Sequence, residues 1–182
     1  VLDCHVAGVS GHAAREEGVN AIYGALQDIE WFRTYRFERV SELLGAVKMS
    51  VTGIEAGTVH NVVPATCRFM VDVRVNELYT NLQILDTIRR HVKCEVSPRS
   101  ISLDSSSVPA EHPVVRRCRE LGLEPYGSPT TSNQAVIPCT SLKIGPGDSA
   151  RSHTANEYIR LDEIERGIET FVRILDGIII EN

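Results

Sequence analysis

The chain has 182 residues, a length typical of one large or two small domains. Its hydrophobic share of 42% and charged share of 24% lie near globular averages and disfavour intrinsic disorder, collagen and coiled coil. The formal net charge of -5 disfavours a nucleic-acid binder, because no excess of positive charge draws the surface toward phosphates. No apolar run approaches the roughly 18 residues of a membrane span, so no membrane segment is expected.

The first residues and the cysteines bear on the compartment. The chain begins Val1-Leu2-Asp3, with neither an initiator Met nor a charged and apolar leader, which indicates no signal peptide and suggests a start that is not the natural one. Five cysteines lie far apart, without a C-x-x-C pair. This distribution favours reduced core thiols over a disulfide frame or a zinc ribbon and predicts a cytoplasmic protein.

Changes in apolar period divide the first half of the chain into strands and a helix. Residues 2–6 alternate between apolar and polar side chains, which predicts a strand. Residues 19–29 carry apolar side chains at spacings of three and four, which predicts a helix that ends near Arg33. Residues 47–51 and 67–75 alternate again and predict two more strands.

A capping signal marks the second helix. Thr80 with Gln83 three residues later predicts a capping box that opens a helix with an apolar stripe over residues 85–92. Residues 94–103 predict a fourth strand. The order β-α-β-β-α-β predicts an α/β (α+β) fold, the ferredoxin-like arrangement of two helices on one face of an antiparallel sheet.

A polar run at residues 104–109 predicts a boundary, because serine and proline interrupt both periods there. Beyond it we expect a short helix at 114–121, an apolar strand around Leu142 and Ile144, and a long helix at 161–175. So few strands would make a marginal independent core. The predicted division is residues 1–106 as one domain and 107–182 as an incomplete second unit.

Familiar catalytic signatures are missing from the sequence. It has no H-E-x-x-H, Walker A, G-x-S-x-G or G-x-G-x-x-G motif, so the chemistry has to be sought in weaker clusters. The first cluster places His12 on a glycine-rich turn between a strand and a helix. Small neighbours leave its imidazole reachable, which suits a proton carrier or an oxyanion donor; the alternative is a surface histidine that caps the helix.

Two further clusters carry polar side chains with two interpretations each. Asn61 lies in a turn before Pro64 and could donate to a substrate oxygen or form an Asx turn. Arg74 could grip a carboxylate, or pair with Asp72 or Glu77 in an ordinary salt bridge.

The last cluster places His153 in a polar loop, as metal ligands often are. Zinc needs about four ligands, and only Asp148 and Glu157 are acids nearby, so a complete metal centre is not expected within this chain.

Four segments, GVSGHAAR, AGTVHNVVP, FMVDVRVN and GPGDSARSHTANEY, follow one another across nearly the whole chain. Together they resemble the acetylornithine deacetylase and succinyl-diaminopimelate desuccinylase family of zinc amidohydrolases, which also includes aminoacylase and glutamate carboxypeptidase. The segments GVNAIYGALQDIEWFRTYRF and PGDSARSHT resemble most the acyl-ornithine deacetylase branch.

The resemblance implies a ferredoxin-like lid, the dimerising domain, inserted into a zinc-binding catalytic domain. It implies that His12 reaches into the partner subunit's active site and polarises the scissile carbonyl. It also implies that Asn61 and Arg74 hold the substrate, with Arg74 binding the carboxylate of the substrate. His153 is implied to be the last zinc ligand. The implied partners are a small-molecule N-acyl amino acid and a second copy in a lid-mediated homodimer, with neither nucleic acid nor membrane.

Several family features do not occur in this sequence. The H-x-D ligand pair, a bridging aspartate, the Glu-Glu pair and a further carboxylate ligand lie upstream of the lid in the family. Glu16-Glu17 follows the lid histidine, so it is expected to be the solvated first turn of a helix. Thr131-Ser132-Asn133 departs from the usual aspartate after the serine. We therefore expect a lid (1–106) and a C-terminal catalytic segment (107–182) that are inactive alone.

The resemblance implies a reaction for the complete enzyme. Two zinc ions, with cobalt as an alternative, activate a bridging water, a glutamate takes its proton, and the hydroxide attacks the acyl carbon. The implied substrate is N-acetyl-L-ornithine or N-succinyl-L-ornithine, in arginine biosynthesis. The alternatives are a succinyl-diaminopimelate desuccinylase or related metallopeptidase, and a non-catalytic dimerisation or ligand-binding module.

Overall fold

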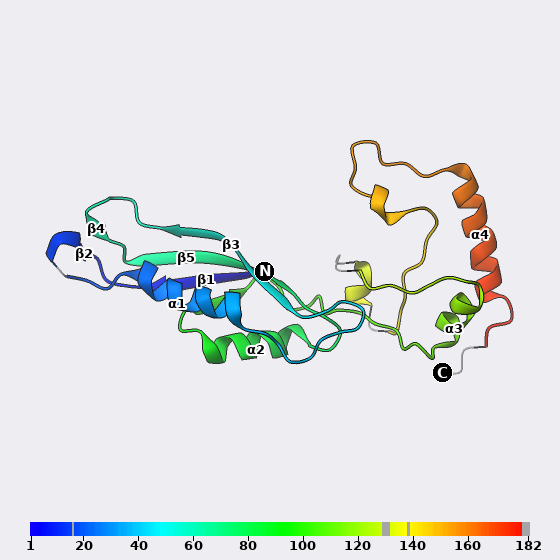
Figure 1. Cartoon of the computed structure of the whole chain (residues 1–182), viewed down its shortest axis with the longest axis horizontal. Coiled ribbons are helices and arrows are strands. Elements are labelled where there is room, and N and C mark those ends of the chain that lie inside the picture. The colour runs from blue at the N-terminus through cyan, green and yellow to red at the C-terminus, as the bar shows by residue number, and fades with distance from the viewer. Residues whose placement is uncertain (16, 129–131, 138, 180–182) are drawn as a thin grey trace. The chain divides into compact units, whose positions relative to one another are not determined.

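The computed structural model describes residues 1–15, 17–128, 132–137 and 139–179 (Figure 1). The chain separates into two compact units. Unit 1 comprises Val1–Ser105 and Ser128–Val136, and unit 2 comprises Ser106–Gly127 and Ile137–Asn182.

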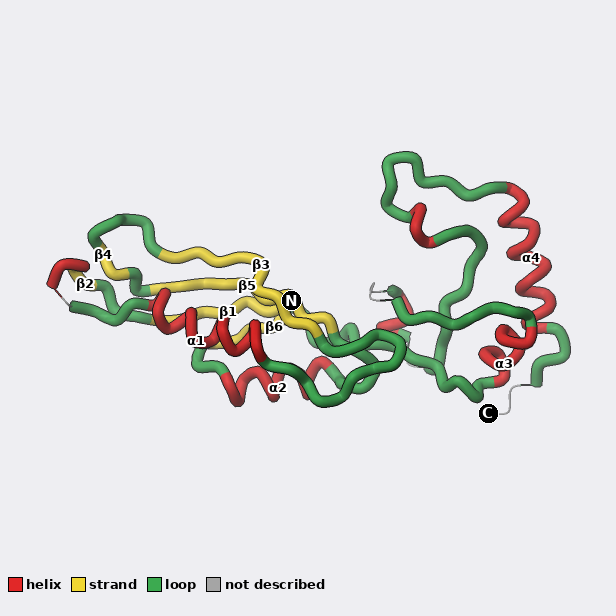
Figure 2. The backbone as a smooth tube through the Cα atoms, viewed as in Figure 1, coloured by secondary structure: helices red, strands yellow, loops and turns green. Residues whose placement is uncertain are grey.

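Unit 1 is built on a four-stranded sheet whose neighbouring strands are all antiparallel, in the order β3-β5-β1-β6. Helix α1 connects β1 to β3, helix α2 connects β5 to β6, and both lie on the same side of the sheet (Figures 1 and 2). The predicted ferredoxin-like β-α-β-β-α-β order is therefore confirmed. The elements are β1 (Leu2–Ala7), α1 (Ala21–Thr34), β3 (Lys48–Ala56), β5 (Thr66–Arg74), α2 (Asn81–His91) and β6 (Glu95–Pro98).

The core lies between the helices and the sheet face that they cover. On β5 the alternation predicted from the sequence buries Cys67, Phe69 and Val71. Helix α1 contributes Phe32, whose ring meets the ring of Phe69 edge to face with centroids 6.0 Å apart. Each such buried aliphatic or aromatic side chain contributes about 1.5–3 kcal/mol by leaving water.

The predicted capping box of α2 is confirmed. Thr80 Oγ1 accepts the backbone N–H of Gln83 at 3.2 Å, and Gln83 Oε1 accepts the N–H of Thr80 at 3.1 Å. Helix α1 begins at Ala21 because the Asn20 side chain accepts the N–H of Ile22 at 2.9 Å. Val19 therefore lies before the helix, where it pairs with Val9 in an isolated bridge.

The strand predictions differ from the structure at two places. The strand expected over 94–103 ends at Pro98. Pro98 pairs with Leu2, the first residue of β1, so β1 offers no strand partner to residues 99–103. Two strands of two residues each, β2 (Gly11–His12) and β4 (Val62–Val63), form a separate small sheet. Two residues are too few to produce an apolar period, so the sequence pattern missed them.

Unit 2 contains the two helices that the sequence predicts, α3 (Pro113–Glu120) and α4 (Leu161–Leu175). A 3₁₀ turn, η3, spans Ser149–Arg151. The strand predicted around Leu142 and Ile144 is wrong: both residues lie in a loop. An apolar run forms a strand only beside a hydrogen-bonding neighbour, and the described residues of unit 2 contain no strand. None of the described helices is long and apolar enough to cross a membrane.

The five cysteines are all unbridged. Cys4 and Cys67 lie in the core of unit 1, as expected for structural thiols, and burial raises the pKa of the Cys67 thiol. Cys139 is exposed, so the expectation of core thiols is wrong for that residue.

A buried carboxylate ties α1 to the segment that leads into β6. Asp28 on α1 is 4% exposed, and its two oxygens accept the backbone N–H groups of Lys93 at 3.0 Å and Cys94 at 2.8 Å. A carboxylate suits this position because both of its oxygens only accept hydrogen bonds.

We expect Asp28→Asn to lower the free energy of unfolding by about 1–3 kcal/mol, because one acceptor becomes an NH2 group facing a backbone N–H. Denaturant unfolding measures this. Asp86→Asn is the control, since Asp86 is an exposed partner of Arg90 on α2 and its loss should cost no more than about 0.5 kcal/mol. Equal effects of the two substitutions would contradict the role of Asp28.

Candidate functional site

Two distant segments of unit 1 meet at one end of the sheet and form what we call the tip, residues 8–15, 17–19 and 57–65 (Figure 2). In the tip, Gly11 pairs with Val63 and His12 with Val62. The N–H of Ala13 donates to the backbone oxygen of Asn61 at 3.0 Å. The structure therefore brings His12 and the Asn61 backbone together, although the sequence places them in separate motifs.

The tip backbone is packed too closely for side chains at its glycines. A Cβ on Gly8 would lie 2.2 Å from the carbonyl oxygen of Val19, and one on Gly11 would lie 2.3 Å from that of Glu17. Gly18 has a φ of +89°, which L side chains rarely adopt. The glycines of the GVSGH motif are thus required by close backbone approach, and this packing holds the segment that carries His12.

The imidazole of His12 is exposed and makes a local hydrogen bond. The backbone N–H of Ala14 donates to Nδ1 of His12 at 3.1 Å, at the start of the 3₁₀ turn η1 (Ala13–Arg15). The alternative interpretation, a cap of the following helix, is wrong in that respect: Asn20 caps α1, and the contact of His12 caps the 3₁₀ turn η1. It occupies Nδ1 and does not engage Nε2, so capping and ligand binding are compatible.

Arg74 lies at the other end of β5 from the tip. Eight residue steps separate Thr66 from Arg74, which at about 3.3 Å per residue corresponds to about 26 Å. Nε of Arg74 donates to Oδ2 of Asp72 at 2.7 Å, so the ordinary salt bridge considered for it is present. The structure does not bring Arg74 to His12 or Asn61 within one chain.

His153 lies in a turn of unit 2 with an unusual backbone. Its φ of 62° is left-handed, and its N–H donates to Oε2 of Glu157 at 3.1 Å. The hydroxyl of Thr154 donates to the backbone oxygen of Arg151 at 2.7 Å. Asp148 caps η3 by accepting the N–H of Ala150 at 2.9 Å.

An ion pair that the sequence analysis missed anchors this turn to α4. Arg151 donates from both terminal nitrogens to the carboxylate of Glu163, at 2.8 and 2.6 Å, and the two side chains are only 23% and 14% exposed. The guanidinium also lies 4.7 Å from the ring centroid of Tyr158. The hydrogen bonds from Arg151, helped by the N–H of Arg160, lower the pKa of Glu163 to about 2. The sequence signal that could have indicated this pair is Glu163, an acid in the first turn of a predicted helix.

The donor set does not complete a metal centre. Among the described residues, histidine, cysteine and acidic side chains nowhere gather in threes around a position that could hold an ion. Zinc takes about four ligands, and Asp148 and Glu157 already accept hydrogen bonds within the loop. The described part of this chain therefore offers His153 as a single imidazole. Glu16 and Thr131 lie outside the described residues, and Asn133 begins a 3₁₀ turn, η2 (Asn133–Val136).

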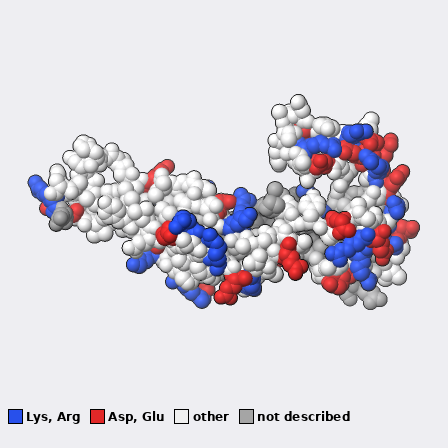
Figure 3. All heavy atoms as spheres, viewed as in Figure 1, with Lys and Arg blue, Asp and Glu red and all other residues white. Residues whose placement is uncertain are grey.

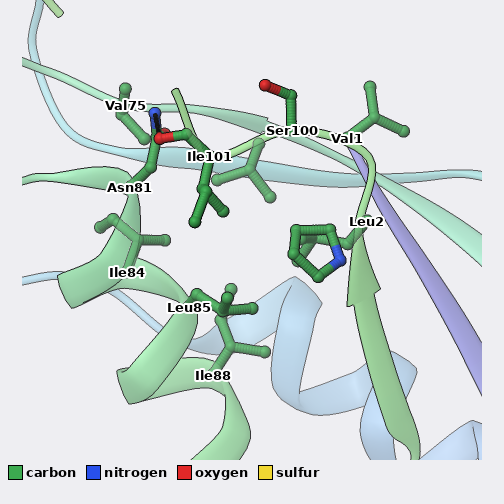
Figure 4. A pocket seen from close by; sticks show the side chains of 11 residues that line it. Val1, Leu2, Val75, Asn81, Ile84, Leu85, Ile88, Ser100 and Ile101 are labelled. Carbon is green, nitrogen blue, oxygen red and sulfur yellow. Dashed lines mark hydrogen bonds between the residues drawn. The ribbon is translucent and has the colours of Figure 1, made fainter. Parts of the chain in front are cut away.

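Two hollows differ in size. One of about 40 Å³ lies between α2 and the ends of β1 and β6, lined by apolar side chains such as Leu85 and Ile88 (Figure 4). It is too small for a substrate, since ligand pockets measure about 300–1,000 Å³. The other, about 300 Å³, lies beside α4 in unit 2 and is lined by Gly145–Gly147 and by Glu163, the residue that anchors the His153 turn.

Residues 2–99 match the family described as the peptidase dimerisation domain of M20 type. The chain belongs to this M20 family. The family resemblance is thereby confirmed, and the matched residues contain the first three of the four motifs and span the ferredoxin-like part of unit 1.

Named relatives of this M20 chain are longer than it is. It is 31% identical to succinyl-diaminopimelate desuccinylase 2 of Ruegeria sp. over 93% of the chain and 47% of that protein. It is 45% identical over 38 residues to N-acetyl-L-citrulline deacetylase of Xanthomonas campestris, which is 21% of the chain and 10% of that protein. The structure resembles aminopeptidase PepT of Bacillus cereus with a TM-score of 0.64 and 22% identity, over 96% of the chain and 50% of the aminopeptidase. The M20 chain thus spans about half the length of the desuccinylase and of the aminopeptidase.

We expect the His153 turn to loosen in acid. Glu163 has a pKa lowered from 4.5 to about 2, so its pairing with Arg151 stabilises the turn fully above pH 4.5 and is lost as the pH falls toward 2. Hydrogen exchange of the amides at residues 151–157 measures this. Glu163→Gln should abolish the transition and Glu169→Gln, on the exposed part of α4, should keep it; a transition that survives in Glu163→Gln would contradict the assignment.

Proposed function

We propose that residues 1–106 are the lid, and residues 107–182 the C-terminal catalytic segment, of a metal-dependent amidohydrolase that cleaves a linear amide bond of an N-acyl amino acid. The observation that carries this proposal is the tip, where a glycine-packed backbone presents His12 beside the Asn61 turn within the matched dimerisation domain. An exposed imidazole held on a rigid turn can donate to an acyl oxygen as charge develops there.

The proposed substrate is N-acetyl-L-ornithine or N-succinyl-L-ornithine, which would place the enzyme in arginine biosynthesis. The alternative substrate is N-succinyl-diaminopimelate. The relative named as a succinyl-diaminopimelate desuccinylase supports this alternative. All three molecules carry an acyl amide and a carboxylate, so the same contacts would serve each. A non-catalytic dimerisation or ligand-binding module is the remaining alternative.

We divide the proposed roles between two subunits. His12 and Asn61 would serve the acyl oxygen, and Arg74 would bind the carboxylate with the terminal nitrogens that its bond to Asp72 does not use. About 26 Å separate the two ends of β5, more than a small amino acid derivative spans. We therefore assign the tip to the site of a partner subunit and Arg74 to the site of its own subunit.

The proposed metal is zinc, two ions in the complete enzyme, with cobalt as an alternative. His153 would be the ligand that this chain supplies, and the remaining ligands would come from outside it. The acids next to His153 support this division, because each is engaged in the hydrogen bonds of the loop. We accordingly propose that the 182-residue chain is inactive by itself.

The proposed protein partner is a second copy of this chain, joined through the free edge of β3 and the outer face of α1. Within the described residues β3 is an edge strand of nine residues, whereas the other edge, β6, has four and ends in a proline that protects it. On α1, which packs against β3, Tyr23 and Leu26 are 69% and 53% exposed at helical spacing. On the face shown in Figure 3, few charged side chains lie around β4 and the adjoining part of β5.

We expect Leu26→Lys and Ile54→Lys to shift the chain from dimer to monomer, because each places a charge on an apolar surface that the partner would cover. Sedimentation velocity over a concentration series measures the mass. Leu82→Lys on α2 is the control, since Leu82 is 59% exposed and lies outside the proposed interface. A dimer that resists both substitutions, or that Leu82→Lys dissociates, would exclude this surface.

We expect the protein encoded by the complete reading frame around these residues to release free amine from the proposed substrates when loaded with zinc. His12→Ala should lower kcat by about 100- to 1,000-fold, the usual loss of one oxyanion donor. His60→Ala, a neighbouring exposed histidine of the tip, should leave kcat unchanged. An unaltered kcat in His12→Ala would refute the assignment, and no hydrolysis of any candidate would favour the non-catalytic module.

A further inference from the structure

The ring of His12 is held by a partner that can only donate. The backbone N–H of Ala14 points its hydrogen at Nδ1, 3.1 Å away, so Nδ1 must present a lone pair. A neutral imidazole carries one proton on one of its two nitrogens. With Nδ1 accepting, the proton of neutral His12 resides on Nε2.

We propose that the backbone N–H of Ala14 is a positioning group that fixes neutral His12 as the Nε2–H tautomer, so that the ring presents a donor to its ligand. The inference rests on the proposed function of the tip and specifies its chemistry. The ligand atom that His12 takes is then an acceptor oxygen, a carbonyl or an oxyanion. In this state Nε2 has no lone pair with which to remove a proton, so His12 does not serve as a general base.

The backbone around Ala14 is held from two sides, which keeps its N–H in place. The N–H of Ala13 donates to the oxygen of Asn61 at 3.0 Å, and His12 itself pairs with Val62 across the small sheet. Gly11, just before His12, has no room for a Cβ beside the Glu17 carbonyl. The direction of the Ala14 N–H is thus set by the fold of the tip.

Two other histidines of the chain also make a backbone hydrogen bond through Nδ1, one with an acceptor and one with a donor. Nδ1 of His91 lies 2.7 Å from the carbonyl oxygen of Thr87, which only accepts, so neutral His91 must carry its proton on Nδ1. Nδ1 of His112 accepts the N–H of Val114 at 3.3 Å, as His12 does from Ala14. These two rings are internal references for the tautomer of His12.

The test is long-range ¹H–¹⁵N correlation spectroscopy of the ¹⁵N-histidine-labelled 182-residue chain at alkaline pH, with signals assigned from His12→Gln and His91→Gln variants. We expect Nε2 of His12 and His112 to have the shift of a protonated nitrogen and Nδ1 that of a bare one, with the reverse in His91. His60, exposed in the tip turn, serves as the reference for an unconstrained ring. A protonated Nδ1 in His12, or a mixture like that of His60, would overturn the inference.

Two substitutions of His12 in the complete, metal-loaded enzyme separate the donor role of Nε2–H from the capping role of Nδ1. His12→Gln places an amide N–H where Nε2–H lies, whereas His12→Asn can accept the Ala14 N–H but offers no donor that far out, as Asn20 accepts from Ile22. We expect Asn to lower kcat about 100-fold or more and Gln to lower it less. Equal losses would refute the donor role specified here. The tautomer spectrum does not depend on turnover, so an inactive wild-type enzyme would count against the proposed function alone.

Discussion

Strand β5 is hydrogen-bonded on both sides, to β3 and to β1, and the arrangement of unit 1 depends on this double pairing. Its inward side chains, led by Phe69 and Val71, are the floor on which α1 and α2 pack. Because the strand is nine residues long, it also separates the two ends that carry candidate site residues by about 26 Å. One end leads into β4 and the tip, and the other carries Arg74.

This separation is the physical argument for the proposed dimer. Side chains at opposite ends of an extended strand cannot contact one small ligand, whatever their chemistry. If both ends contribute to one site, a second subunit has to supply one of them. The exposed edge of β3 and the apolar stripe on α1 offer a surface for a second copy, and the protected edge of β6 does not.

The two candidate histidines are held in different ways. His12 is positioned by backbone: three close-packed glycines, a two-residue sheet and the N–H of Ala14. His153 is positioned by side chains. Its left-handed turn begins next to Arg151, and Arg151 is fixed to Glu163 by two charge-assisted hydrogen bonds. Substitutions near His12 therefore act through steric fit, whereas those near His153 act through charge and respond to acid.

The cap that His12 forms on η1 and a contact of its ring with a ligand do not compete for the same nitrogen. An imidazole has two nitrogens, and a cap uses one of them. For Arg74 the salt bridge to Asp72 uses Nε, and the planar guanidinium has further donors. In both cases the local structural contact orients the group and uses only part of its hydrogen-bonding capacity.

The sequence by itself determined the β-α-β-β-α-β order, the capping box at Thr80, helices α3 and α4, and the family, because each of these depends on local period, local capping or contiguous motifs. The tertiary structure alone decided that β2 and β4 pair, that the strand expected at Leu142 does not form, and that Arg151 meets Glu163. Those outcomes depend on which distant segments become neighbours, and two-residue strands or a single ion pair leave no periodic trace. The separation of Arg74 from the tip belongs to the same class, since only the extended course of β5 places its ends so far apart.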